Sequence, residues 1–425
     1  MIIVDLARRD ECGSRFSTGR WLSVLWCVLL TGLAGSPAWA AEDWSGQLAD
    51  ALKIGEFDLG FRYRYEFVDA AGASKDANAS TLRTRLVYKS AEFRDVSLTI
   101  NMDDLRPIIG RDFNDTRNGK TQYPVVADPK GTDLNQAALT WTGVDGGTLV
   151  LGRQRIIRAN HRFIGNVGWR QNEQTYDALT FAYRIDEKFD VFYGYIDDVR
   201  RIFGPESGTP TRRFESDSHL LDARYDFGPA VRLSGYVYLL DFDNAAGASN
   251  QTVGLRATGS IPLDVGPKLG YVAEFATQSD YKGNPVNYDA DYFVIEGKAA
   301  WEQFGFRLGY EVLEGNGAAG GSFQTPLATL HAMNGWADKF LSTPAGGLED
   351  FYIEGNVKFL QGNWRLIYHD FSANSGGGDY GDEIDFVASW KLAQNYGVMV
   401  KFASYSADQF SSDTDKLWVM LTANF

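Results

Sequence analysis

The sequence predicts an all-β protein, a single transmembrane antiparallel up-and-down β-barrel of about 18 strands, with about 16 as the alternative. Three observations carry this prediction. Apolar and polar residues alternate through most of the chain, an export signal stands at the N-terminus, and the last alternating segment, residues 416–425, ends on an aromatic residue. Because successive side chains of a strand point to opposite faces, each such segment has one apolar face. An exported chain with this pattern spans a membrane only as a closed barrel.

The first 40 residues have the features of a signal peptide. Two arginines precede an apolar run at residues 21–33, which is too short to span a bilayer as a helix. The small residues Ala38 and Ala40 then supply the pattern of a cleavage site. We therefore predict a cleaved signal peptide at residues 1–40 and one barrel domain at residues 41–425. Both cysteines lie in the first segment, so we expect a mature protein without disulfides.

The first predicted strand shows the alternation most clearly. One face is mostly aromatic and carries Phe57, Leu59, Phe61, Tyr63, Tyr65 and Phe67. The other face is polar and includes two arginines and a glutamate. In a barrel the aromatic face meets lipid while the interior stays polar. Similar stripes follow in residues 82–88, 96–102, 189–195, 269–275, 293–299, 304–310, 351–359, 384–390 and 398–402.

The predicted connections come in two sizes, as in outer-membrane barrels. Short turns are predicted near residues 186–188, 228–230, 302–303, 361–363 and 393–395. Long loops cover approximately residues 104–131, 158–172, 198–216, 280–288, 314–347 and 372–381. The strand number stays open because residues 132–141, 147–157 and 231–240 do not alternate cleanly.

The composition argues against several classes of function. A formal net charge of −14 disfavours a nucleic-acid partner. None of the four histidines has a serine or thiol placed for nucleophilic catalysis, and no metal-ligand spacing occurs. We therefore expect a protein that is not an enzyme and that has no catalytic residues, cofactor or metal.

The inward face of the barrel determines which solute it conducts. The basic candidates are Arg62, Arg64, Arg83, Arg85, Arg153, Arg155, Arg224, Arg256, Lys298, Arg307, Arg365 and Lys401. The acidic candidates are Glu274, Glu296, Glu311, Glu354, Glu383 and Asp385. Arginine suits an anion path because its planar fork binds carboxylate and stays charged. The alternative is that these charges pair with one another and only brace the wall.

Two loop segments carry aromatic, amide and charged groups together. The first contains Trp169, Arg170 and Glu173, and the second contains His331, Trp336 and Asp338. Such a mixture can form a constriction or gate in the lumen. The alternative is that both loops simply pack on their own barrel.

These two segments also carry a resemblance. Residues 152–178, GRQRIIRANHRFIGNVGWRQNEQTYDA, and residues 322–352, SFQTPLATLHAMNGWADKFLSTPAGGLEDFY, are similar to the signature of alginate-export-family outer-membrane proteins. The resemblance implies a barrel that moves an acidic polysaccharide such as alginate through an arginine-lined lumen. It also implies periplasmic export partners.

The residues together predict a bacterial outer-membrane channel for an anionic solute. A general uptake porin for small carboxylates or sugars is the first alternative, and a plugged barrel acting as receptor or adhesin is the second. The expected partners are outer-membrane lipid, the transported solute and the barrel-assembly machinery, which would bind through Phe425. We expect a monomer.

Overall fold

A computed structural model describes residues 44–261 and 263–425 of the protein, so the predicted signal peptide at residues 1–40 lies outside the described residues. The chain divides into two units, Met1–Asp50 and Ala51–Phe425, and the barrel belongs to the second. Helix α2, Trp44–Lys53, which the alternation did not predict, precedes the first strand in the chain. Among the described residues, no helix is long and apolar enough to cross a membrane.

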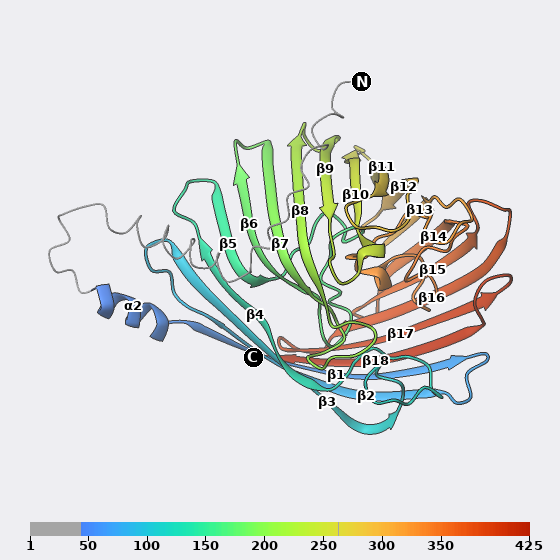
Figure 1. Ribbon diagram of the computed structural model, residues 1–425, viewed down its shortest axis with the longest axis horizontal. Helices are drawn as coiled ribbons and strands as arrows, with labels where there is room; N and C mark the ends of the chain where they lie inside the picture. The colour runs from blue at the N-terminus through green and yellow to red at the C-terminus, as the bar shows by residue number, and fades with distance from the viewer. Residues whose placement is uncertain (1–43, 262) are drawn as a thin grey trace. The chain divides into compact units, whose positions relative to one another are not determined.

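The barrel is one closed antiparallel sheet of 18 strands (Figure 1). Its first and last strands pair from Gly60↔Asn424 to Ala70↔Thr414, which closes the sheet. The strands are β1 (Glu56–Ala70), β2 (Ala77–Lys89), β3 (Val96–Asp112), β4 (Gly131–Trp141), β5 (Gly147–Gln154), β6 (Thr175–Arg184), β7 (Phe189–Arg200), β8 (Arg213–Asp226), β9 (Arg232–Leu240), β10 (Asn250–Ile261), β11 (Lys268–Asp280), β12 (Asp289–Ala300), β13 (Phe304–Leu313), β14 (Leu348–Phe359), β15 (Gly362–Ser372), β16 (Asp379–Lys391), β17 (Tyr396–Ala407) and β18 (Thr414–Asn424).

The fold class and the larger strand number are therefore confirmed. One cause of the irregular alternation is a bulge between β3 and β4, where Asn101 faces Gln136 but Met102 faces Leu134. Asn135 thereby has no cross-strand partner on β3, and the side-chain parity of β4 changes at that point.

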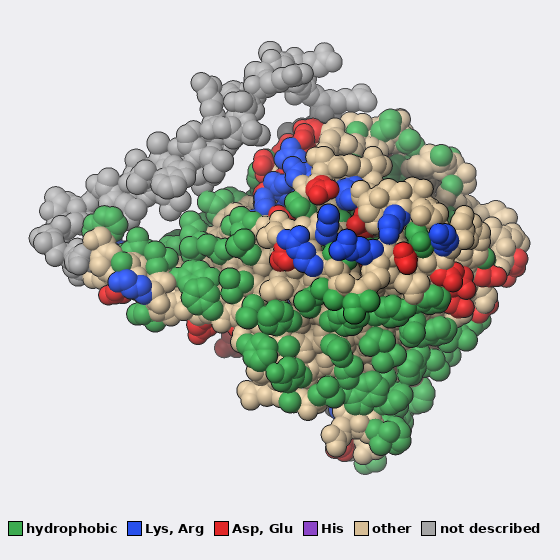
Figure 2. All heavy atoms as spheres, turned by 90° about the horizontal axis from the view of Figure 1, so that it is seen from below, with side chains coloured by type: hydrophobic (Ala, Val, Ile, Leu, Met, Phe, Trp, Pro, Cys, Tyr) green, Lys and Arg blue, Asp and Glu red, His purple; other side chains and the backbone are tan. Residues whose placement is uncertain are grey.

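The strand faces follow the alternation that the sequence predicts. On β12 the side chain of Ile295 is 60% exposed, whereas Tyr292 and Val294 are buried. Figure 2 shows the exposed apolar side chains gathered in a broad band on the face in view. Soluble monomers rarely expose an apolar surface of this extent. In a membrane barrel, lipid covers such a surface.

The two ends of the barrel differ. At the end that we call the turn end, strands are joined by short segments such as residues 301–303 and 360–361. Leu360 and Gln361 both have positive φ, the turn geometry that matches strand twist. At the opposite end, the loop end, the connections include residues 113–130, 155–174, 201–212 and 314–347.

Three of these connections fold into the barrel, and we call them the inner loops: residues 113–130, 155–174 and 314–347. They contact side chains on the polar face of the strands, opposite the apolar band. Phe163 of the second inner loop packs against Tyr236, Tyr292 and Phe323 in a buried aromatic cluster. The barrel interior is therefore packed, and the inner loops form part of the core.

Candidate functional site

The inner loops 155–174 and 314–347 form one packed unit inside the barrel. Ile164 and Leu327 pair as a parallel β-bridge, and the backbone N–H of Gly165 donates to the carbonyl oxygen of Leu327 at 2.9 Å. The rings of Trp169 and His331 stack with centroids 4.5 Å apart and 7° between their planes. Because each loop contacts the other along its length, moving one loop disturbs both.

Glu173 binds the second inner loop to the wall. Its carboxylate accepts hydrogen bonds from Arg85 at 2.7 Å, Arg155 at 2.8 and 2.9 Å, Asn166 at 2.8 Å, and Asn135. Burial alone would raise the pKa of Glu173, but the hydrogen bond from Arg155 and the charges of Arg85 and Arg155 lower it to about 2. Glu173 therefore stays charged and joins β2, β4 and the loop.

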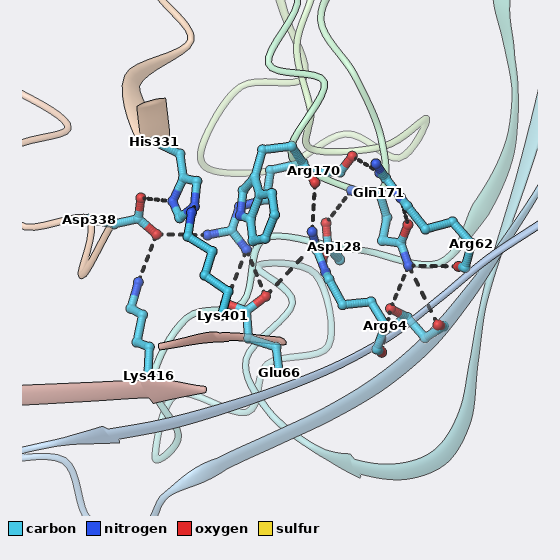
Figure 3. Close-up of polar contacts among 12 residues, drawn as sticks. Arg62, Arg64, Glu66, Asp128, Arg170, Gln171, His331, Asp338, Lys401 and Lys416 are labelled. Carbon is cyan, nitrogen blue, oxygen red and sulfur yellow. Dashed lines mark hydrogen bonds and ion pairs between the residues drawn. The ribbon is translucent and has the colours of Figure 1, made fainter. Parts of the chain in front are cut away.

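The arginines of β1 hold the same loop through its backbone (Figure 3). Arg62 donates to the carbonyl oxygen of Gly168 at 3.0 Å and to the side-chain oxygen of Gln171 at 2.8 Å. Arg64 donates to the carbonyl oxygen of Trp169 at 2.6 Å and forms an ion pair with Asp128 of the first inner loop. One short strand segment thus fixes two inner loops.

Two arginines of this wall have no acidic partner. Within the described part of the chain, no carboxylate oxygen lies at ion-pair distance from Arg62 or Arg83. The Nε atom of Arg83 is buried and has no hydrogen-bond partner there. The neighbouring Arg85, in contrast, is paired with Asp103 at 2.5 Å and with Glu173 at 2.7 Å. The wall of β1 and β2 therefore keeps a positive surplus.

Asp338 of the third inner loop collects three basic partners. It lies 2.7 Å from His331, 3.0 Å from Arg170 and 2.7 Å from Lys416 (Figure 3). Burial opposes ionisation of Asp338, but His331, Lys416 and Arg170 bring its pKa well below the usual range. Burial lowers the pKa of His331, whose Nδ1 atom lies 2.7 Å from the Asp338 carboxylate.

Lys401 lies in a box of tryptophans at the junction of the loops with β17 and β18. Its Nζ atom is 3.6 Å from the ring centroid of Trp336, 4.2 Å from that of Trp169 and 5.4 Å from that of Trp418. It donates to Nε2 of His331 at 2.7 Å. Two rings of the box come from the inner loops and one from the wall, so Lys401 joins them through cation–π contacts.

The acidic side chains of β16 bind the third inner loop by accepting from its backbone. Glu383 accepts from the N–H of Ala337 at 2.7 Å, and Asp385 from the N–H of Trp336 at 3.2 Å. The loop can approach this closely because Gly335 has φ +82° and an added Cβ would collide with the Glu383 carboxylate. These two carboxylates position a loop and are not open to the lumen.

The remaining candidates form ion pairs along the wall. Glu311 contacts Arg162 of the second inner loop at 3.0 Å and accepts from Asn334 at 2.6 Å. Further pairs are Arg256 with Glu274, Arg224 with Asp190, Arg307 with Glu296 at 2.9 Å and with Glu354 at 2.6 Å, Lys298 with Glu296 at 3.1 Å, and Arg365 with Glu354 at 3.8 Å.

A cavity of about 260 Å³ lies between this paired wall and the third inner loop. It is lined by cations and carboxylates together with apolar groups, including Arg256, Arg307, Arg365, Glu311 and Trp336. Because the charges of both signs are paired, this arc of the wall supplies less net attraction for an anion than β1 and β2 do.

One predicted lumen residue lies elsewhere. Arg153 shares its face of β5 with Leu149 and Leu151, and these three residues face Ala137, Leu139 and Trp141 of β4, with Leu139 and Trp141 exposed. Arg153 therefore points away from the lumen, and it pairs with Asp177 of β6 at 2.7 Å. Arg155 lies beyond the end of β5, where the chain turns inward.

Sequence reasoning missed several residues of the site. Asp128 and Gln171 were not singled out because a loop has no period that indicates its direction. Lys416 shares a face of β18 with Trp418, but nothing in the sequence indicates its ion pair with Asp338. Asp350 of β14 pairs with His369 of the neighbouring β15 at 2.8 Å. This contact can be predicted only when the register of the two strands is known.

The histidines occupy structural positions. His331 and His369 are buried beside aspartates, and His219 lies against Tyr193 and Tyr195 on the apolar side of the wall. Within residues 44–261 and 263–425, no group of three or more His, Cys, Asp or Glu side chains is placed to hold a metal ion.

The structure is similar to solved outer-membrane proteins. OccAB4 of Acinetobacter baumannii matches with a TM-score of 0.68 and 15% identity over 87% of this chain and 98% of that chain. OccK9 (OpdG) of Pseudomonas aeruginosa matches with a TM-score of 0.69 and 14% identity over 88% and 99%. The outer membrane protein OpdK of Pseudomonas aeruginosa, also solved with vanillate, gives the same values as OccK9. At these identities the likeness defines the fold, that of an outer-membrane β-barrel.

The resemblance to the alginate-export family is overturned by these comparisons. No family model matches the chain, and no curated protein matches it. The solved barrels that it resembles are OccAB and OccK proteins. The two segments that carried the resemblance lie largely in the second and third inner loops, whose Trp, Arg and Asp residues pack and pair inside the barrel. Alginate export is therefore withdrawn.

Proposed function

We propose that this protein is an outer-membrane channel for the passive uptake of small anionic solutes, carboxylates above all. The observation that carries the proposal is the surplus of arginine on β1 and β2, where Arg62 and Arg83 have no acidic partner among the described residues. The likeness to OpdK, which was solved with vanillate, a carboxylate, supports the same class of solute. The loop end would then face the cell exterior, as in other outer-membrane barrels.

The proposed mechanism is a shallow electrostatic path. The attraction between a guanidinium and a carboxylate exceeds its value in bulk water where the wall excludes solvent. This attraction remains weak enough for the solute to be released, because Arg62 already donates hydrogen bonds to the inner loop, including one to the carbonyl oxygen of Gly168. Three inner loops attached to the wall occupy much of the interior, which suits a small solute better than a polymer.

The proposed partners follow from the outer surface. Lipid covers the apolar band, and we expect the barrel-assembly machinery to bind near Phe425. The backbone of Phe425 exchanges two hydrogen bonds of 2.9 Å with Leu59, and its ring contacts Phe61 and Tyr396 at the turn end. We propose a monomer, because the described barrel needs no second copy to close.

The reversal potential of the refolded protein in a planar bilayer under a salt gradient tests the proposal. We expect anion-selective current, and a loss of that selectivity in the double variant Arg62→Gln/Arg83→Gln. Arg106→Gln is the matched control, since Arg106 is exposed on the outer face of β3 beside Asp104. Unselective current in the unmodified protein would refute the anion path, and an absence of current would favour the receptor alternative.

A further inference from the structure

Two loops at the loop end bring together a second set of basic side chains, outside the site described above. Arg117 belongs to the inner loop 113–130, and Arg201 belongs to the loop 201–212 between β7 and β8. The two loops are in contact, because Arg117 donates to the carbonyl oxygen of Pro210 at 2.7 Å. The ring of Phe203 lies 5.9 Å from the guanidinium of Arg117 and 4.7 Å from that of Arg201.

The guanidinium of Arg201 is held in place without using its full set of donors. It lies between two aromatic rings, with Phe203 at 4.7 Å and Phe214 at 4.3 Å. Its Nη1 atom donates to the carbonyl oxygen of Thr211 at 3.1 Å. Among the described residues nothing accepts from its Nε or Nη2 atoms, which form the edge that binds a carboxylate side-on.

No acid compensates these charges. Within the described chain, no carboxylate oxygen lies at ion-pair distance from Arg117, Arg201 or Arg212. The carboxylate of Asp115, two residues before Arg117, accepts from the backbone N–H groups of Arg117 and Asn118. Burial and the like charge of Arg117 lower the pKa of Arg201 to about 10. Folding therefore brings two cations together at an electrostatic cost that an anion would relieve.

The position of Arg201 is on the way into the barrel. Phe214 is buried and shares the inward face of β8 with Leu220 and with Asp222, which pairs with Arg158 of the second inner loop. Arg201, stacked on Phe214, thus lies on the lumen side of the loop end and not on the lipid face.

We propose that Arg201, stacked between Phe203 and Phe214 and supported by the charge of Arg117, is a binding site for a carboxylate with an adjoining apolar group. The free Nε–Nη2 edge takes the carboxylate oxygens, and the partly exposed ring of Phe203 contacts the apolar part. This inference rests on the proposed function, since the site lies at the loop end, from which an anion would enter.

Binding and flux of benzoate test the site, with the refolded protein in detergent and in proteoliposomes. Arg201→Gln is expected to weaken benzoate binding by about tenfold, because a charge-assisted bidentate contact is lost. The half-saturation concentration for uptake should rise by a similar factor while the maximal flux stays unchanged. Arg201→Lys keeps the charge but lacks the planar fork, so it is expected to bind nearly as weakly as the Gln variant.

Two further variants define the apolar part and control for misfolding. Phe203→Ala removes one of the stacked rings and should weaken benzoate more than acetate, whereas Arg106→Gln, on the outer face, should change neither. Each variant is checked for a folded barrel by its mobility in an unheated detergent gel. Unchanged benzoate binding in Arg201→Gln overturns the site. Full binding in Arg201→Lys also overturns it, because simple charge attraction would then suffice.

Failure of this inference differs from failure of the proposed function. A barrel that remains anion-selective while Arg201→Gln leaves binding and half-saturation unchanged refutes the site alone. A barrel without anion selectivity that ignores benzoate refutes the channel proposal and the site together.

Discussion

Two arcs of the barrel wall hold the inner loops by opposite chemistry. On β1, Arg62 and Arg64 donate to loop carbonyl oxygens, whereas on β16, Glu383 and Asp385 accept from loop N–H groups. A guanidinium has five donors and keeps its charge after binding a carbonyl oxygen. The buried carboxylates of Glu383 and Asp385 accept from the loop backbone, and Asp385 also lies 3.8 Å from Nε2 of His369. Because Arg62 and Arg83 have no acidic partner among the described residues, we expect the arc of β1 and β2 to attract anions more strongly than the arc of β16.

The largest effect is expected from removing the loop that the acidic arc binds. The backbone N–H of Gly317 donates to the carbonyl oxygen of Ala345 at 2.9 Å, so residues 318–344 can be excised where the chain ends already meet. We expect single-channel conductance to rise severalfold, because the excision removes Trp336, Asp338 and their contacts from the lumen.

A deletion of Gly376 and Gly377, in the connection between β15 and β16, is the matched control. Both glycines have positive φ, and a Cβ at either would meet nothing within 4 Å, so they lie in open space. This deletion should leave the conductance unchanged. Equal conductance in the excised and unmodified proteins would show that the third inner loop does not narrow the passage.

The sequence predicted the wall well and the interior poorly, for a physical reason. Strand faces follow from a period of two, which predicts Arg62, Arg83, Glu383 and Lys401 on the lumen face. The prediction for Arg153 was wrong because it went against the same period, which places Arg153 on the outward face of β5 with Leu149 and Leu151.

The contacts of the inner loops have no such period. The ion pair of Asp338 with Lys416 joins residues far apart in the chain, and so does the parallel bridge of Ile164 with Leu327. Their geometry depends on the closed barrel, which sets the distance between β18 and the loops. Composition alone marked Trp169, Glu173 and Trp336 as unusual without indicating what they would touch.

The next largest effect is expected at Glu173, the carboxylate that pairs with Arg85 and Arg155. Glu173→Gln leaves Arg85 and Arg155 without their shared carboxylate in a buried site, where breaking an ion pair costs about 3 kcal/mol. We expect the free energy of unfolding, measured by urea titration in detergent at pH 7, to fall by this amount. Glu215→Gln is the control, because the pair of Glu215 with Arg213 is largely exposed and contributes under about 1 kcal/mol.

The same variant has a defined pH dependence. The pKa of Glu173 is lowered from 4.5 to about 2 in the folded protein, so its contribution is fully present above pH 4.5. It is lost as the pH falls from 4.5 towards 2. The difference between the unmodified protein and Glu173→Gln should therefore be constant near neutral pH and shrink by pH 3. A difference that grows on acidification would contradict this assignment.

A smaller effect is expected at the tryptophan box. Lys401→Met keeps the length of the side chain but removes its contacts with Trp169 and Trp336 and its hydrogen bond to His331. Desolvated cation–π contacts contribute about 2 kcal/mol, and methionine recovers part of this by packing. We expect a loss of about 1 kcal/mol and more frequent transitions between conductance levels. Lys298→Met, at a half-exposed pair with Glu296, should leave the current steady.

The last and smallest effect is expected from Arg62→Lys, which separates the charge of Arg62 from the geometry of its guanidinium group. Arg62→Lys keeps the positive charge but cannot donate at once to Gly168, Arg170 and Gln171, which Arg62 reaches through different nitrogen atoms. We expect an unchanged reversal potential together with a loss of stability of about 1 kcal/mol. The control Arg106→Lys, on the outer face, should alter neither quantity. A loss of selectivity in Arg62→Lys without a loss of stability would contradict this expectation. It would show that the planar fork of Arg62 contacts the solute directly and does not only hold the inner loop.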